Sequence, residues 1–280
     1  MIKILAPAKI NLALDVLRRR PNGYHEVDMV MQPLTLADEI VLEPSPELEL
    51  FCNQPQLPTD CRNLAWQAAD LLRREMAIAD GVRITIHKKI PVAAGLAGGS
   101  SDAAAVLNGL NQLWQLGLTT VELMELGLKL GADVPFCVLQ QTARAQGIGE
   151  QLTPFASSLK CRVLIITPNV AVSTAAVYRQ LVVETIQRHP QVTEVIAALQ
   201  EGNLERLADS WGNVLEEVVL PRYPEVVKIK ATLRRFGAVH CLMSGSGPSV
   251  FALDPPEACI GLILQELPEL WFKSLCDFKN

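Results

Sequence analysis

The stretch that decides the fold is Pro91-Val-Ala-Ala-Gly-Leu-Ala-Gly-Gly-Ser-Ser101, a run of small residues that leads into a helix. The helix is predicted because apolar residues recur at helical spacing between Val106 and Trp114. A glycine-rich turn before a helix exposes backbone N–H groups and the positive end of the helix dipole, which together bind anions. The turn therefore predicts a phosphate site, and the alternative is a close backbone crossing that needs small residues. The candidate phosphate-binding residues are Pro91, Val92, Ala93, Ala94, Gly95, Leu96, Ala97, Gly98, Gly99, Ser100 and Ser101.

The N-terminal stretch is the second place where the pattern indicates chemistry. Apolar residues alternate with polar or small ones from Lys9 to Val16, which predicts a strand with one buried face and one face that can carry chemistry. Side chains two positions apart on a strand point to the same side. Lys9 and Asn11 are therefore expected to lie next to each other.

Strand and helix patterns do not alternate strictly along the chain, so the expected fold class is α+β rather than a doubly wound parallel sheet. The length of 280 residues suggests two domains, which we place at residues 1–155 and 156–280. Strands are predicted at 27–36, 39–42, 82–87, 161–167, 239–243 and 249–253, a hairpin at 142–152, and helices at 63–76, 173–181 and 194–200. Thr119 and Glu122 fit the capping box of another helix, which is expected to end at Gly131.

Composition excludes several classes of protein. Apolar residues make up 49% of the chain and charged residues 20%, values typical of a globular rather than a disordered protein. The net charge of -5 argues against nucleic acid as a partner, and the basic pairs Arg73-Arg74, Lys88-Lys89 and Arg234-Arg235 are predicted to be solvated. Neither a membrane-spanning stretch nor an export signal is recognisable, so we expect a cytoplasmic protein without a membrane partner.

The cysteine and histidine pattern predicts no metal bound by the protein. Seven cysteines occur without any C-x-x-C spacing, and the four histidines lack the spacing of zinc ligands. The cysteines are expected to be reduced and mostly buried.

Three segments resemble, in the family's order, the motifs of the galactokinase–homoserine kinase–mevalonate kinase–phosphomevalonate kinase (GHMP) superfamily. They are Pro7-Ala-Lys-Ile-Asn-Leu12, the Pro91–Ser101 turn followed by Asp-Ala-Ala, and Met243-Ser-Gly-Ser-Gly-Pro-Ser249. From the first of these segments to the last, the resemblance spans most of the chain. It implies ATP as phosphoryl donor and a two-domain α+β GHMP kinase fold, with a ribosomal-protein-S5-domain-2-like N-terminal domain, a ferredoxin-like C-terminal domain and the active site in the cleft between them.

Three further segments resemble one branch of this superfamily: Pro21-Asn-Gly-Tyr-His25, Gly131-Ala-Asp-Val-Pro135 and Gly147-Ile-Gly-Glu150. That likeness implies ATP-dependent phosphorylation, with Mg²⁺, of the 2-hydroxyl of 4-diphosphocytidyl-2-C-methyl-D-erythritol in non-mevalonate isoprenoid biosynthesis. The implied partners are this small molecule and ATP. We expect the protein to be a monomer or weak homodimer. Two alternatives stay open: another GHMP kinase, of the homoserine or mevalonate type, and a non-catalytic binding protein of the same fold.

Residue by residue, the resemblance places the catalytic aspartate at Asp133 and the catalytic lysine at Lys9. Phosphoryl transfer depends on positioning and charge stabilisation more than on covalent chemistry. A carboxylate can accept or orient the hydroxyl proton, while a nearby ammonium keeps that carboxylate ionised and stabilises the developing negative charge. Taken alone, Asp133 could be a turn residue and Lys9 a solvated lysine. The presence of both argues against the non-catalytic alternative.

The resemblance assigns the cytidine end of the substrate to Tyr24 and His25, with Asn11 on the first strand beside them. Cytosine has a flat π face and a distinctive edge, so aromatic stacking and a few hydrogen bonds can select it. Thr174 and Tyr178 correspond, in a looser match, to substrate-contacting positions. The helical spacing of Tyr178 fits a core residue equally well.

The glycine-rich turn also departs from the family pattern. It carries alanine at Ala93, Ala94 and Ala97, where the family usually has more glycine. Because alanine disfavours positive φ, ordinary backbone dihedrals are expected at all three. No acidic pair with an evident metal-binding role stands out, so Mg²⁺ is expected to be held chiefly by ATP phosphates and water.

Overall fold

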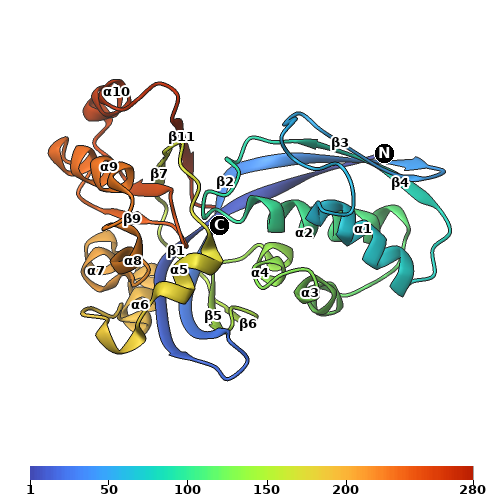
Figure 1. Ribbon diagram of the computed structural model, residues 1–280, viewed down its shortest axis with the longest axis horizontal. Helices are drawn as coiled ribbons and strands as arrows, with labels where there is room; N and C mark the ends of the chain where they lie inside the picture. The colour runs from blue at the N-terminus through green and yellow to red at the C-terminus, as the bar shows by residue number, and fades with distance from the viewer. Residues whose placement is uncertain (280) are drawn as a thin grey trace. The chain divides into compact units, whose positions relative to one another are not determined.

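The computed structural model describes residues 1–279, which form two compact units built from mixed helices and strands (Figure 1). Unit 1 contains Met1–Ala8, Leu36–Val92 and Ala97–Gln140, and unit 2 contains Lys9–Thr35, Ala93–Leu96 and the chain from Gln141 onward. Two long strands, β1 (Ile2–Arg19) and β2 (His25–Ser45), therefore contribute residues to both units. The α+β class is confirmed. The domain boundary predicted between residues 155 and 156 falls within unit 2 and stays a prediction.

Unit 1 is a sheet with helices on one face (Figure 1). Its strand order is β3-β4-β2-β1, in which β3 (Leu48–Cys52) runs parallel to β4 (Gly81–His87) and β4 runs antiparallel to β2. Helices α1 (Leu64–Glu75) and α2 (Gly98–Leu113) pack against each other, and α3 (Thr120–Leu128) and α4 (Val134–Leu139) pack against α2. The strand predicted at 82–87 and the helix predicted at 63–76 are confirmed.

Helix α3 begins as the sequence predicts but ends earlier. Thr119 and Glu122 form the capping box, in which each side chain satisfies the other residue's backbone N–H. The predicted end at Gly131 is wrong. The N–H of Leu130 instead closes a tight turn on the carbonyl of Gly127 at 2.9 Å, so the helix finishes without a left-handed glycine.

The strand patterns at 27–36 and 39–42 form one continuous strand, β2, rather than two. Asp38 lies between the two patterns and is completely buried. Its carboxylate accepts hydrogen bonds from the backbone N–H groups of Lys89 and Ile90, which satisfies its charge inside the fold. The strand can therefore continue through Asp38.

In unit 2, β1 and β2 acquire further partners. Strand β5 (Ala143–Gly147) pairs antiparallel with β2, and β6 (Gln151–Pro154) pairs with β5, which confirms the hairpin predicted at 142–152. The short strand β8 (Gly212–Asn213) runs parallel to β1.

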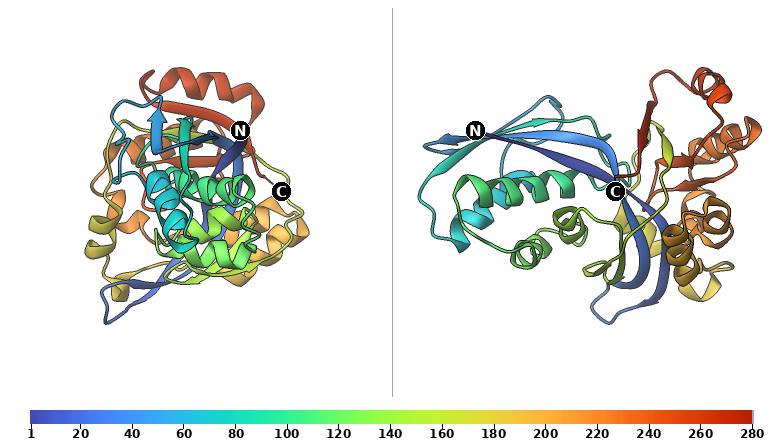
Figure 2. Two further views of the ribbon diagram at one scale, coloured as in Figure 1. Left: turned by 90° about the vertical axis from the view of Figure 1, so that its right-hand side faces the viewer. Right: turned by 180° about the vertical axis from the view of Figure 1, so that it is seen from behind.

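A second sheet of unit 2 has the order β11-β7-β10-β9, with every neighbouring pair antiparallel. Its strands are β7 (Arg162–Thr167), β9 (Cys241–Met243), β10 (Val250–Leu253) and β11 (Phe272–Asp277). The helices of this unit are α5 (Thr174–Gln180), α6 (Val192–Glu201), α7 (Leu204–Ser210), α8 (Glu216–Val219), α9 (Pro224–Arg235) and α10 (Glu257–Glu266), with a 3₁₀ turn at Val183–Thr185. Helix α9 packs on β9 and β10, and Figure 2 shows α9 and α10, orange to red, on one face of the sheet.

Strand β1 is buried on both faces between Ala6 and Val16, so the expected polar face is a buried polar strip. Its groups pair with one another or with neighbours, as buried polar groups must. Asp15 Oδ1 accepts the N–H of Val16 and lies 2.7 Å from His189 Nδ1. The strip therefore provides fixed, desolvated polar groups rather than mobile surface ones.

The described residues bear on two further expectations, for the cysteines and for a membrane-spanning segment. All seven cysteines are free thiols, and Cys137, Cys161, Cys241 and Cys276 are buried, as predicted. Across residues 1–279, no helix combines the length and apolarity needed to cross a bilayer.

Candidate active site

The glycine-rich segment forms a loop whose last residue, Ala97, precedes the first turn of α2. Ala93 has φ 53° and Ala97 has φ 57°, both left-handed, whereas Ala94 does not have a positive φ. The expectation of ordinary dihedrals is therefore wrong at two of the three alanines. A left-handed conformation costs an alanine about 1–2 kcal/mol, so other contacts must hold the loop in this shape.

Three consecutive carbonyl groups fasten the loop within unit 2. The carbonyl oxygens of Ala94, Gly95 and Leu96 accept hydrogen bonds from Ser249 N, Ser244 Oγ and Lys9 N, at 3.3, 2.9 and 3.1 Å. Glycine is required at Gly95, because φ is +75° and a Cβ would lie 2.3 Å from the carbonyl oxygen of Ser244. Residues of the first sequence motif (Pro7–Leu12) and of the third (Met243–Ser249) thus contact the middle of the second motif (Pro91–Ser101).

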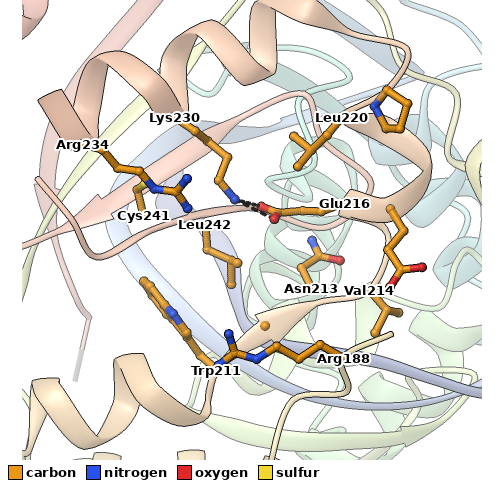
Figure 3. Close-up of a pocket in the computed structure, with 13 residues that line it drawn as sticks. Arg188, Trp211, Asn213, Val214, Glu216, Leu220, Lys230, Arg234, Cys241 and Leu242 are labelled. Carbon is orange, nitrogen blue, oxygen red and sulfur yellow. Dashed lines mark hydrogen bonds and ion pairs between the residues drawn. The ribbon is translucent and has the colours of Figure 1, made fainter. Parts of the chain in front are cut away.

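A cavity of about 450 Å³, lined from β8, α8, α9 and β9, adjoins the third motif (Figure 3). In its wall, Glu216 accepts hydrogen bonds from Lys230 Nζ at 2.5 and 2.6 Å and from Met243 N at 2.9 Å. Asn213 Nδ2 donates to the carbonyls of Met243 and Gly245, each at 2.8 Å. These wall residues hold the third motif in place. Sequence reasoning missed them, because single polar residues outside a motif carry no distinctive signal.

Lys9 and Asn11 lie together on β1, as their spacing predicts. Lys9 Nζ donates to Asn11 Oδ1 at 2.8 Å, and the residues are 5% and 0% exposed. Asn11 Nδ2 is 3.4 Å from the sulfur of Met29. Because the backbone of Lys9 also bonds to Leu96, the buried ammonium belongs to the same part of unit 2 as the middle of the loop. A solvated surface lysine is excluded.

Asp133 is the residue that precedes α4 in unit 1. Its carbonyl oxygen accepts the N–H of Cys137 at 3.1 Å, while its carboxylate does not cap the helix. Pro135 in the first turn fixes the backbone, because proline is favoured there and has no N–H to lose. The helix start therefore holds the position of the aspartate backbone, and the pairing of its carboxylate with Lys9 stays a prediction.

The two aromatic residues predicted at the cytidine end differ in exposure. Tyr24 is 59% exposed, whereas His25, the first residue of β2, is 9% exposed. The ring of His25 lies 5.2 Å from the ring of Tyr178, with the planes tilted by 39°. Burial, together with the charge of Arg19, lowers the pKa of His25, so the imidazole is neutral at pH 7. Tyr178 is half-buried rather than a core residue.

Thr174 begins α5 and connects this helix to the third motif. Its hydroxyl oxygen lies 2.7 Å from that of Ser246, while Ser173 Oγ caps the helix by accepting the N–H of Ala176. The structure thus brings Thr174 to the Ser244–Pro248 loop, and Tyr178, one turn further along α5, to His25.

The sequence matches two profiles of one family. Residues 63–141 match the GHMP kinases N terminal domain, and residues 195–272 match the GHMP kinases C terminal domain. Together the two matches cover more than half of the described chain, in the order the family requires. The chain belongs to the GHMP kinases, and it is a small-molecule kinase.

Among small-molecule kinases, the chain is similar over most of its length to kinases of one name. The 4-diphosphocytidyl-2-C-methyl-D-erythritol kinase of Geobacillus kaustophilus is 54% identical over 255 residues, which are 90% of this chain and 88% of the relative. A kinase of the same name from Bacillus cereus is 50% identical over 252 residues, 89% of this chain and 87% of that one. A crystal structure of 4-(cytidine 5'-diphospho)-2C-methyl-D-erythritol kinase covers 100% of both chains with TM-score 0.84 and 34% identity. Homoserine kinase from Cytophaga hutchinsonii shares the fold, with TM-score 0.77 and 19% identity over 99% of this chain and 94% of that chain.

Proposed function

We propose that the chain transfers the γ-phosphoryl group of ATP to the 2-hydroxyl of 4-diphosphocytidyl-2-C-methyl-D-erythritol, a step of non-mevalonate isoprenoid biosynthesis. The observation that carries the proposal is the 50–54% identity with kinases of this name over about nine-tenths of the chain. The meeting of Lys9, Gly95 and Ser244 in unit 2 supports it, because it joins the three family motifs.

In this proposal the Pro91–Ser101 segment holds the ATP phosphates. Helix α2 begins at Gly98, so its free N–H groups and its positive dipole end are directed at the loop. The left-handed residues Ala93 and Ala97 and the left-handed Gly95 turn the chain tightly before the helix. Oriented backbone amides of this kind suit a polyphosphate better than a single lysine would, because their positions are fixed in advance.

Asp133 and Lys9 are the proposed catalytic pair. The 2-hydroxyl oxygen forms a bond to the γ-phosphorus while the bond from that phosphorus to the β–γ bridging oxygen breaks, and ADP leaves. The hydroxyl proton passes to the carboxylate of Asp133. The ammonium of Lys9, buried and oriented by Asn11, stabilises the negative charge of the transferring group.

His25, Tyr24 and Tyr178 are the proposed cytidine residues, with Asn11 and Thr174 as further substrate contacts. A neutral imidazole has one donor and one acceptor nitrogen, so it can read both kinds of group on the edge of cytosine. The lowered pKa of His25 supports this role at pH 7. The exposed ring of Tyr24 and the tilted ring of Tyr178 offer apolar faces to the base.

Mg²⁺ enters the proposal as part of the ATP complex. Within residues 1–279, no group of three or more His, Cys, Asp or Glu side chains is arranged to hold a metal. Asp102 Oδ1, a buried carboxylate oxygen without a hydrogen-bond partner in that range, is closed off from solvent. Phosphate oxygens and water are therefore its proposed ligands.

We further propose that the enzyme acts in the cytoplasm and that it is a monomer or weak homodimer.

Phosphorus NMR of a reaction mixture tests the proposed function. With ATP, Mg²⁺ and 4-diphosphocytidyl-2-C-methyl-D-erythritol, one new phosphomonoester signal should grow in step with ADP. Consumption of ATP without a phosphomonoester on this substrate would contradict the proposal.

A further inference from the structure

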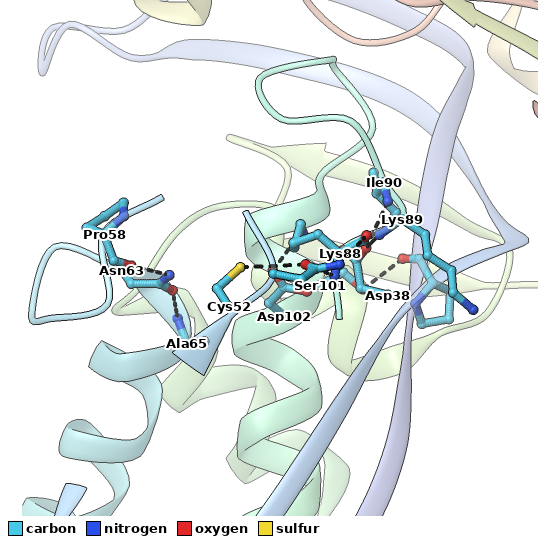
Figure 4. Close-up of polar contacts among 12 residues, drawn as sticks. Asp38, Cys52, Pro58, Asn63, Ala65, Lys88, Lys89, Ile90, Ser101 and Asp102 are labelled. Atoms are coloured by element: carbon cyan, nitrogen blue, oxygen red, sulfur yellow. Dashed lines mark hydrogen bonds and ion pairs between the residues drawn. The ribbon is translucent and has the colours of Figure 1, made fainter. Parts of the chain in front are cut away.

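Lys88 lies in the segment that joins β4 to the glycine-rich loop. The sequence predicts a solvated lysine here, but Lys88 is buried. Its Nζ lies 2.5 Å from Asp38 Oδ2 on β2 and 2.8 Å from Asp102 Oδ2 on α2 (Figure 4). All three side chains are at most 5% exposed. One ammonium and two carboxyl groups thus form a closed cluster within unit 1, which we call the Lys88 cluster.

The two carboxyl groups of the Lys88 cluster are not equivalent. Asp38 Oδ1 accepts hydrogen bonds from the backbone N–H groups of Lys89 and Ile90 at 2.5 and 2.8 Å, so three donors serve its carboxylate. Asp102 Oδ2 accepts a hydrogen bond from Lys88 Nζ, but Asp102 Oδ1 is buried without a hydrogen-bond partner among the described residues. A buried ionised oxygen without a donor is costly, so the geometry favours a neutral acid at Asp102 over one at Asp38.

The Lys88 cluster lies against the first turn of α2. A Cβ built on Gly98 would be 3.2 Å from Lys88 Nζ and 3.1 Å from Ile90 Cγ2, so the ammonium contacts the residue where the loop becomes helix. Ser101 Oγ, in the same turn, donates to the carbonyl of Pro7 at 2.7 Å. Asp102 follows directly. The start of α2 is therefore fixed from beneath by one charge cluster and one hydrogen bond.

We propose that Lys88 and Asp102 are positioning residues for the ATP triphosphate, and that the protonation state of Asp102 tunes the attraction of the loop for it. The proposal rests on the proposed function, in which the Pro91–Ser101 segment holds the phosphates. With Asp102 neutral, Asp38 and Lys88 cancel, and the positive end of α2 acts unopposed. With Asp102 ionised, the cluster carries one net negative charge beneath the first turn of α2 and opposes a polyphosphate.

The groups that face Asp102 decide the pH range of this effect. They are Lys88 after β4, Asp38 on β2 and the thiol of Cys52 on β3, while the residues buried by α1, α3 and α4 are apolar apart from the thiol of Cys137. Burial raises the pKa of Asp102 to about 7, against the lowering effect of Lys88 and with a contribution from Asp38. Burial also raises the pKa of Cys52, so this thiol stays neutral near pH 7.

Calorimetric titration with the Mg²⁺ complex of a non-hydrolysable ATP analogue tests the proposal. For the unmodified protein, Kd should rise about fivefold between about pH 6 and about pH 8.5, the order expected of one added charge near a polyphosphate. Asp102→Asn imitates the neutral acid, so its Kd should stay low and change by less than about twofold over the same range. The ligand's own titration is common to both proteins and cancels in the comparison.

Asp28→Asn is the matched control. Asp28 lies on β2 and, like Asp102, is a largely buried carboxylate. Its two oxygens accept hydrogen bonds from Arg144, at 2.8 and 2.6 Å. This variant should keep the pH profile of the unmodified protein. A profile for Asp102→Asn that coincides with the unmodified one, or a flat profile in the unmodified protein, would overturn the inference.

The KM values of Lys88→Met distinguish a positioning role of Lys88 from a purely structural one. A positioning role raises KM for ATP and leaves KM for the alcohol substrate unchanged, whereas general loosening of the fold raises both. Amide NMR shifts of Gly98–Ser101 on addition of the analogue separate the two proposals. If these amides do not respond, the loop assignment in the proposed function fails. If they respond while Asp102→Asn keeps the unmodified profile, only the present inference fails.

Discussion

The rings of His25 and Tyr178 lie 5.2 Å apart, although one residue begins β2 and the other lies on α5. Neither ring is fully exposed, and the two are tilted by 39°. Tilted and offset arrangements are favourable for aromatic pairs. The pair therefore forms a preorganised aromatic wall, which the proposed function uses to recognise cytosine.

Removal of one ring of this wall should weaken substrate binding selectively. Tyr178→Ala should raise KM for the cytidine substrate about tenfold, because stacking of a base on an aromatic ring contributes about 1–3 kcal/mol. KM for ATP should not change. Tyr178→Phe is the control, since it keeps the ring. Steady-state kinetics with each substrate varied in turn give the answer, and an equal rise of both KM values would argue for a structural role.

The proposed base should be needed for turnover but not for ATP binding. Asp133→Asn removes the proton acceptor and keeps the shape of the side chain, so kcat should fall at least about a hundredfold. The Kd of an ATP analogue, measured by calorimetry, should stay within about twofold of the unmodified value. Turnover close to that of the unmodified protein would remove Asp133 from the mechanism.

The two glycines that begin α2 should differ in their tolerance of alanine. At Gly98 a Cβ would press on Ile90 and on the ammonium of Lys88, whereas at Gly99 the nearest atom is Leu64 Cδ1 at an ordinary 3.7 Å. Gly98→Ala should therefore raise KM for ATP, and Gly99→Ala should not. Because both variants add the same methyl group to the same turn, helix propensity cancels between them. Equal kinetics for the two variants would exclude a tight contact beneath Gly98.

Replacing Ala97 with glycine should stabilise the protein. Its φ of 57° costs an alanine about 1–2 kcal/mol, whereas glycine adopts this conformation freely. After the greater entropy of glycine in the unfolded chain is subtracted, Ala97→Gly should raise the free energy of unfolding by up to about 1 kcal/mol. Ala94→Gly, at a residue without a positive φ, should lower it. Urea denaturation of both variants checks the sign.

Asp102 should make the stability of the protein depend on pH. Its pKa is raised from 3.8 to about 7 in the folded state, so between these values the native protein holds a proton that the unfolded chain has lost. The native state binds more protons, and stability therefore falls as pH rises from about 4 to about 7. Asp102→Asn lacks this titration. Thermal melts should show the unmodified protein losing Tm relative to Asp102→Asn over that interval, and parallel Tm curves would contradict the assignment.

Much of the fold followed from local pattern. Period-two alternation located β1 and β4, and the capping box located the start of α3, because these signals depend on residues close in sequence. The pairing of Lys9 with Asn11 followed from the same periodicity. The proximity of His25 to Tyr178 could be expected only through family resemblance, since nothing local relates a strand start to a distant helix.

Other features could not be predicted, because they arise from packing between distant segments. Lys88 looks like half of a solvated basic pair until Asp38 and Asp102 are brought to it from β2 and α2. The left-handed conformation of Ala93 and Ala97 opposes their intrinsic preference, and hydrogen bonds to the loop from β1 and from the third motif help to hold it.

The proposed function requires that this GHMP kinase act on a cytidine-linked alcohol. A coupled assay of ADP release, with ATP and Mg²⁺, should compare kcat/KM for 4-diphosphocytidyl-2-C-methyl-D-erythritol, homoserine and mevalonate. We predict turnover of the cytidine compound and none above background with the other two. Preferential turnover of homoserine or mevalonate, or binding of ATP without turnover of any of the three, would contradict the claim.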